Sequence, residues 1–139
     1  MDVSSGAQPL IDKETGTALA VNGEIYNHKK IRASTASFPY QTGSDCEVIL
    51  ALYRTHGTEL VHQLEGMFAF VLYDVHNDTW LIGRDSIGII PLYYGHTANG
   101  ELMVASEMKG IEPLCEDVSE FPPGHTWSSA DSAPVKYYN

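Results

Sequence analysis

Every residue from Met67 to Tyr73 is apolar, and this run constrains the fold more than any other feature of the sequence. A strand with one face in water alternates apolar and polar side chains. An unbroken apolar run is typical of a strand that is buried on both faces. Such a strand needs packed layers above and below its sheet. The run therefore predicts the central strand of a layered domain.

The segments around this run predict an antiparallel sheet system with one well-defined helix. Ser44 and Glu47 have the spacing of a capping box, in which the Glu47 carboxylate would accept from the Ser44 N–H, and Gly57 is placed to end the helix. Asn99-Gly100 is a hairpin signal. Further elements are expected at residues 58–63 and 107–111 (helical) and at 79–84, 89–94, 102–106 and 125–128 (extended). The fold class is α+β.

The composition excludes several classes of partner. The chain has 139 residues, enough for one domain, with 8 Lys and Arg against 18 Asp and Glu and a net charge of −10. Nucleic acids and anionic membranes need clustered basic residues, so neither is expected as a partner. No apolar run approaches a membrane-spanning length, and the first residues lack the pattern of a signal peptide. The expected location is cytoplasmic.

The cysteines and histidines do not predict a metal site. Cys46 and Cys115 form no disulfide framework, and the six histidines lack the spacing of a zinc site. No phosphate-binding loop or dinucleotide fingerprint is present, so no cofactor is expected in this chain. A helix N-terminus can lower the pKa of a thiol, but Asp45 and Glu47 flank Cys46 and disfavour its thiolate. Both cysteines are interpreted as helix or core residues.

Asn22-Gly23 follows the short apolar run 18–21 and reads as a turn with a positive φ. It is either a plain hairpin turn or an oxyanion hole, made by the Asn22 side-chain amide and the Gly23 N–H. Asp45 either stabilises the helix dipole or pairs with a ligand ammonium group. Arg84-Asp85 either forms a structural ion pair and turn or braces the wall of a site. These residues alone leave each choice open.

Several blocks of the chain resemble, in the same order, the glutaminase domain of glutamine-hydrolysing asparagine synthetases. This domain is a class II glutamine amidotransferase. Glu24-Ile25-Tyr26-Asn27 after Asn22-Gly23 is similar to the asparagine-synthetase branch in particular. The matching blocks are residues 21–28, 42–49, 66–70, 83–93, 105–109 and 121–124.

The resemblance implies an N-terminal-nucleophile fold, an αββα sandwich of two antiparallel sheets. It also implies that a cysteine thiol attacks the carboxamide of L-glutamine, forms a thioester and releases ammonia. Asn22 and Gly23 would form the oxyanion hole, Glu24 would lie in the substrate-binding turn, and Asp45 would hold the α-ammonium group. A synthetase domain, using ATP and Mg²⁺, would then amidate aspartate, and the full enzyme could be a homodimer.

Residues 1–139 are expected to be a partial, N-terminally truncated domain of this type. The family pattern begins before Met1, so the nucleophilic cysteine and the arginine for the α-carboxylate of glutamine are expected to lie outside this sequence. The synthetase domain is expected to be absent as well. The chain alone is therefore expected to hydrolyse no glutamine. The alternative is a catalytically dead module that binds glutamine or a partner.

Overall fold

The computed structural model describes residues 8–138, which form two antiparallel sheets and a small number of helices. The larger sheet has the strand order β1-β2-β3-β4-β8-β9, and the smaller has the order β6-β5-β7. The strands are β1 (Leu10–Ile11), β2 (Ala18–Ile25), β3 (Gly66–Asp74), β4 (Thr79–Arg84), β5 (Tyr93–His96), β6 (Leu102–Ala105), β7 (Asp117–Glu120), β8 (His125–Ser128) and β9 (Val135–Lys136). The helices are α1 (His28–Ser34), α2 (Val48–His56) and α3 (Met108–Ile111), with 3-10 segments η1 (Asp45–Glu47) and η2 (Gly57–Gln63).

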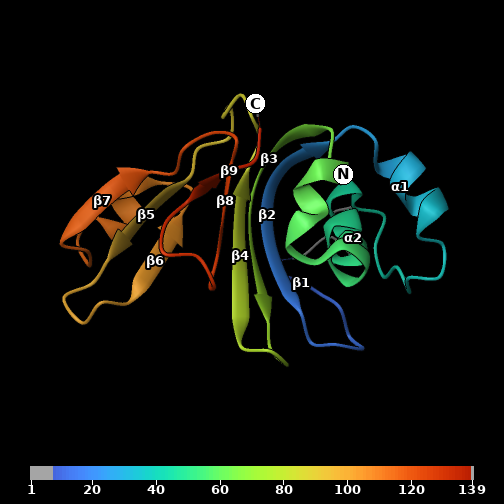
Figure 1. Cartoon of the computed structure of the whole chain (residues 1–139), viewed down its shortest axis with the longest axis horizontal. Helices are drawn as coiled ribbons and strands as arrows, with labels where there is room; N and C mark the ends of the chain where they lie inside the picture. The colour runs from blue at the N-terminus through green and yellow to red at the C-terminus, as the bar shows by residue number, and fades with distance from the viewer. Residues whose placement is uncertain (1–7, 139) are drawn as a thin grey trace.

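The six-stranded sheet is covered on both faces. Helices α1 and α2 lie on one face, and the smaller sheet lies on the other (Figure 1). Along β3, Phe70 and Leu72 belong to the core shared with α2, whereas Ala69 belongs to the core between the sheets. This alternation confirms that β3 is buried on both faces at its centre. The architecture confirms the expected α+β sandwich of two antiparallel sheets.

The apolar face of α2 explains how the helical layer is held. Val48, Ile49 and Leu52 are at most 2% exposed and pack in the same core as Leu19 and Val21 of β2. Gly57 ends α2 with a φ of +57°, as the sequence predicted. The helical layer is therefore anchored on β2 and β3, the two strands nearest the predicted site.

The structure corrects the expected turn at Asn22-Gly23. Strand β2 continues through these residues to Ile25, and Asn22 and Gly23 pair with Ala69 and Phe68 of β3. The positive φ was predicted correctly, since Gly23 has a φ of +124°. The hairpin signal of Asn-Gly is overridden here because β3 offers a continuous pairing partner. Glu24 consequently lies in a strand and not in a turn.

Other element predictions were partly wrong. The strand expected at residues 89–94 is displaced to β5, Tyr93–His96, because residues 85–92 form an irregular loop. Strands β1 and β7 and helix α1 were not predicted. β7, with the sequence Asp-Val-Ser-Glu, has no apolar pattern and forms through its pairing with β5. The strands at 79–84, 102–106 and 125–128 and the helical segments at 58–63 and 107–111 are confirmed to within one residue.

Arg84 and Asp85 form a structural loop brace and do not pair with each other. The Arg84 guanidinium donates to Glu120 Oε1 and to the backbone carbonyls of Ile90, Gly88 and Phe121. The Asp85 carboxylate accepts from the N–H of Phe68 at 2.8 Å and from the N–H of Gly88 at 2.9 Å. Both residues are at most 3% exposed. The brace fixes the loop after β4 and connects the two sheets.

Candidate active site

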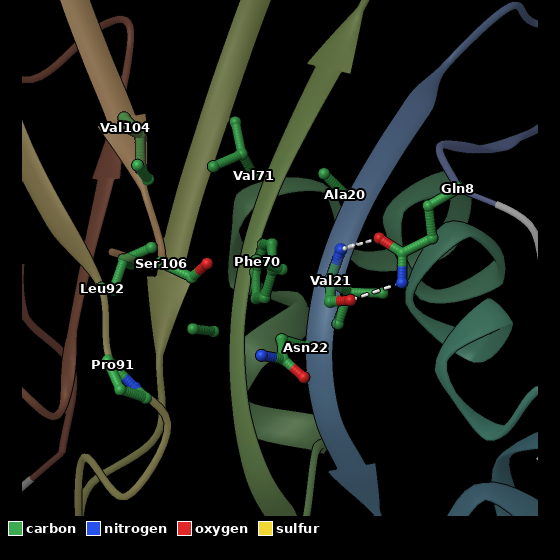
Figure 2. Close-up of a pocket in the computed structure, with 12 residues that line it drawn as sticks. Gln8, Ala20, Val21, Asn22, Phe70, Val71, Pro91, Leu92, Val104 and Ser106 are labelled. Carbon is green, nitrogen blue, oxygen red and sulfur yellow. Dashed lines mark hydrogen bonds between the residues drawn. The ribbon is translucent and has the colours of Figure 1, made fainter. Parts of the chain in front are cut away.

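The edge of β2 that faces away from β3 is bound by side chains. Gln8 acts like a strand partner: its side-chain oxygen accepts from the Val21 N–H at 2.8 Å, and its side-chain nitrogen donates to the Val21 carbonyl (Figure 2). Farther along, the Ile25 N–H donates to Asp45 Oδ2 at 2.7 Å. The Cys46 thiol donates to the Gly23 carbonyl at 3.7 Å. These contacts fix the edge of β2 on either side of Gly23.

Gly23 is required by the close approach of β3. A Cβ atom at this position would lie 2.0 Å from the Met67 carbonyl oxygen, and its φ of +124° is unfavourable for other residues. The glycine therefore lets the two backbones meet and leaves the β2 edge free of a side chain at this point. An oxyanion donor at the Gly23 N–H would need an edge of this kind.

Three of the four predicted site residues line one groove. Gly23, Glu24 and Asp45, together with Ser44 and His28, border a groove of about 410 Å³. Asn22 lines a neighbouring cavity of about 210 Å³ between the two sheets (Figure 2). The structure therefore brings Gly23, Glu24 and Asp45 together and places Asn22 on the adjoining side of β2. No residue lines both concavities, but each is lined by one of the consecutive residues Asn22 and Gly23.

The inter-sheet cavity explains why the Asn22 side chain is accessible. Alternate residues of β2 point to opposite faces, so Val21 packs toward the helices while Ala20 and Asn22 face the smaller sheet. Leu92 and Ser106 line the opposite wall of this cavity. Figure 2 shows the Asn22 amide beside β2, on the side of the strand that carries Phe70 and Val71. The amide can therefore donate to a group bound in this space.

Asp45 lies at the start of η1, where the structure differs from the expected capping box. Ser44 does cap the turn, since its hydroxyl oxygen accepts from the Cys46 N–H at 3.3 Å. Glu47, however, does not bind the Ser44 N–H. Its carboxylate accepts from the N–H groups of Gln41 and Thr42 instead. The expected capping box is therefore half formed, because Thr42 Oγ1 accepts from the Ser44 N–H.

Cys46 is held as a thiol. Its side chain is buried, and burial together with the nearby carboxylates of Asp45 and Glu24 raises its pKa to about 12. A thiol with this pKa is almost entirely protonated near neutral pH and is a poor nucleophile. The prediction that Cys46 is a core residue is confirmed.

Cys46 is therefore expected to resist alkylation. At pH 8 the thiolate fraction of a thiol with a pKa near 12 is about a thousandfold lower than that of a free thiol with a pKa near 9, and burial slows the reaction further. Iodoacetamide should modify Cys115 well before Cys46, as followed by peptide mass spectrometry over time. In denaturant both cysteines should react at similar rates. Equal rates in the folded protein would contradict this environment for Cys46.

Two further results concern the described residues 8–138. Within this range, no three His, Cys, Asp or Glu residues gather as a group that could hold a metal ion. None of the helices in the same range is long and apolar enough to span a membrane.

The two stacked antiparallel sheets with helices beside them have the architecture of an N-terminal-nucleophile amidotransferase. Residues 1–121 match the family model described as a glutamine amidotransferase domain, and the chain belongs to this family. It is 53% identical over 140 residues to asparagine synthetase B [glutamine-hydrolyzing] of Escherichia coli and 48% identical over 139 residues to asparagine synthetase [glutamine-hydrolyzing] 2 of Arabidopsis thaliana. Both matches cover 100% of this chain but only 25% and 24% of the relatives. The chain thus spans about a quarter of their length and corresponds to their glutaminase portion.

A comparison with solved structures supports the fold. The glutamine phosphoribosylpyrophosphate amidotransferase of B. subtilis matches 93% of this chain and 31% of its own, with a TM-score of 0.73 and 23% identity. A glutamine aminotransferase class-II domain protein from Silicibacter pomeroyi matches 88% of this chain and 68% of its own, with a TM-score of 0.61 and 18% identity. At these identities the similarity establishes the architecture alone.

Proposed function

We propose that this domain binds L-glutamine and hydrolyses its side-chain amide, and that the ammonia serves the ATP-dependent amidation of aspartate in a second domain. The relatives' names, asparagine synthetase [glutamine-hydrolyzing], support the overall reaction. The observation that carries the proposal is the edge of β2, where Gly23 lies between two backbone N–H groups that are already bound. Val21 donates to Gln8 and Ile25 donates to Asp45.

The Gly23 N–H is proposed as the first oxyanion donor. Backbone groups of alternate residues in an antiparallel strand point to the same edge, so the Gly23 N–H faces the same side as those of Val21 and Ile25. The Cys46 contact with the Gly23 carbonyl supports this direction. With no Cβ to shield it, this N–H is accessible to an oxygen atom in the groove. The Asn22 amide is proposed as the second donor, from the adjoining cavity.

Asp45 is proposed to bind the α-ammonium group of glutamine. Its Oδ2 atom is held by the Ile25 N–H, which fixes the carboxylate at the wall of the groove. Glu24 adds a second carboxylate to the same groove. A groove with two carboxylates and an exposed N–H suits a ligand that carries an ammonium group and a carbonyl oxygen. Glutamine carries both.

The chemistry follows from the placement of these donors. When a cysteine thiolate attacks the carboxamide carbon, the amide oxygen becomes negatively charged, and hydrogen bonds from Asn22 and Gly23 would stabilise it. The proton lost by the thiol is transferred to the amide nitrogen as this intermediate collapses, so that ammonia leaves and a thioester forms. Water then hydrolyses the thioester to glutamate and regenerates the thiol. Each of the two donors is more valuable in the transition state than in the ground state.

The thiol for this reaction is proposed to come from outside residues 1–139. Cys46 is buried and protonated, and Cys115 lies between α3 and β7, in the smaller sheet's part of the structure. Residues 1–139 alone are therefore proposed to release no ammonia from glutamine. The burial and protonation of Cys46 also favour one alternative, a module that binds glutamine without hydrolysing it. Glutamine binding without glutamate release by the natural protein would support this alternative.

Asp45→Asn tests the ammonium site. The amide oxygen of asparagine can still accept from the Ile25 N–H, so the fold should be preserved, but the ion pair with the substrate is lost. We expect the KM for glutamine to rise about 10- to 100-fold, as for other hydrogen bonds to charged groups, with kcat changed little. Glutamate release by the natural protein and its variant, measured over a range of glutamine concentrations, gives both constants.

Glutaramate provides the matched control, because it is glutamine without the α-amino group. Its hydrolysis should be equally slow in the unsubstituted protein and in Asp45→Asn. The variant Asp117→Asn, which changes an exposed carboxylate on β7, should behave like the unsubstituted protein toward both substrates. A similar loss of activity toward glutamine and glutaramate in Asp45→Asn would show that Asp45 does not bind the ammonium group.

A further inference from the structure

The Glu47 carboxylate is buried and is bound almost entirely by one loop. The residue is 2% exposed. Its Oε2 atom accepts from the Gln41 N–H at 2.7 Å, and Oε1 accepts from the Thr42 N–H at 2.8 Å and from the Thr42 hydroxyl at 2.5 Å. A buried carboxylate is costly unless it is well hydrogen-bonded. Here the bonds that compensate for its burial come from the segment that leads to Asp45.

Arg32 holds the carbonyl groups of the same loop. It extends from α1, and one of its guanidinium nitrogens donates to the Thr42 carbonyl at 3.1 Å and to the Ser44 carbonyl at 2.7 Å. The guanidinium also stacks on the Tyr40 ring, 4.2 Å from its centroid. The loop's N–H groups thus bind an anion and its carbonyl groups bind a cation. Opposite charges on two different helical elements hold this backbone in one conformation.

The loop held in this way is a wall of the proposed ammonium site. Gly43, Ser44 and Asp45 line the groove that also contains Gly23 and Glu24. Asp45 is one residue beyond the carbonyl that Arg32 binds. Movement of the Thr42 and Ser44 backbone would therefore displace the Asp45 carboxylate relative to the edge of β2.

We propose that Glu47 is a positioning residue, assisted by Arg32, that sets the affinity for the substrate's ammonium group by fixing the loop 41–44. This inference rests on the proposed function of Asp45. Glu47 does not line the groove, so it acts through the loop and not through contact with the substrate. The consequence is that a neutral substitution at Glu47 should weaken the binding of glutamine more than it slows the reaction.

Glu47→Gln is the variant that tests the proposal. The amide keeps one acceptor oxygen but presents an NH₂ group to a backbone N–H, so one of the two backbone bonds is lost together with the charge. We expect the KM for glutamine to rise about tenfold and kcat to stay within about twofold. In parallel, hydrogen exchange of the Gln41 and Thr42 amides should become faster, while the amides of α2 keep their protection. Glu59→Gln is the matched control, because Glu59 is exposed and its side chain pairs with His62.

Each result has a defined meaning. A raised KM with faster exchange confined to the loop supports the proposal, and recovery of the KM in Glu47→Asp would strengthen it. An unchanged KM would overturn it, as would a fall in kcat with loss of protection throughout α2, which would show that Glu47 only supports the fold. If the unsubstituted natural protein neither bound nor hydrolysed glutamine, the proposed function would fail. The exchange at Gln41 and Thr42 would then still decide whether Glu47 fixes the loop.

Discussion

Gly23→Ala is expected to lower the free energy of unfolding by about 3 kcal/mol or more. The added Cβ would lie 2.0 Å from the Met67 carbonyl oxygen and 2.9 Å from Phe68 Cα, so two paired backbones would have to separate. The residue would also be held at a φ of +124°. Alanine normally stabilises a strand relative to glycine, so the sign of the effect is itself informative. Urea unfolding followed by circular dichroism measures the change.

Gly100→Ala separates the two causes of this loss. Gly100 also has a positive φ, +81°, but a Cβ there would meet no atom within 4 Å. Its substitution should cost only the conformational strain, about 1 kcal/mol. The difference between the two variants therefore measures the collision with β3. If both variants lost the same stability, β2 and β3 would have to relax easily at Gly23, and the rigid edge proposed for the oxyanion donor would be wrong.

The parts of the fold that the sequence predicted are those with a strong local pattern. The apolar run in β3 identified a strand buried on both faces, because residues 67–73 are enough for a strand but too few for a typical buried helix. Gly57 and the Asn99-Gly100 hairpin were predicted because turn chemistry depends on neighbouring residues. β7 and α1 were not predicted. β7 forms through its pairing with β5, and α1 buries only Ile31 of its seven residues.

The candidate site was predicted by residue identity and not by arrangement. Asn22, Gly23, Glu24 and Asp45 were identified from the sequence, but the interpretation of Asn22-Gly23 as a turn was wrong because β3 continues the pairing. The roles of Gln8 and Glu47 could not be predicted, since both bind backbone groups whose position depends on tertiary structure. A buried glutamate so close to a helix start was compatible with the capping box. Only the path of residues 41–42 in the folded chain distinguishes a Glu47 that caps the helix from a Glu47 that binds the loop.

Asn22→Ala is expected to reduce kcat for glutamine hydrolysis by the natural protein about 10²–10³-fold. The loss of one oxyanion donor removes an interaction that matters mainly when charge develops on the amide oxygen, so the KM should change less than kcat. Stability should be retained, because the Asn22 side chain faces a cavity and its backbone pairing with Ala69 does not depend on it. Steady-state glutamate release and thermal unfolding measure the two effects.

Two comparisons decide whether Asn22 acts as a donor. Asn22→Asp has nearly the same shape but replaces the NH₂ donor with an anion, which would repel the developing negative charge, so its kcat should be at least as low as that of Asn22→Ala. Asn99→Ala, in an exposed hairpin, should leave kcat unchanged. A raised KM with normal kcat in Asn22→Ala would instead mean that the amide binds the substrate in its ground state. The inter-sheet cavity would then be a binding pocket, and the oxyanion would depend on Gly23 alone.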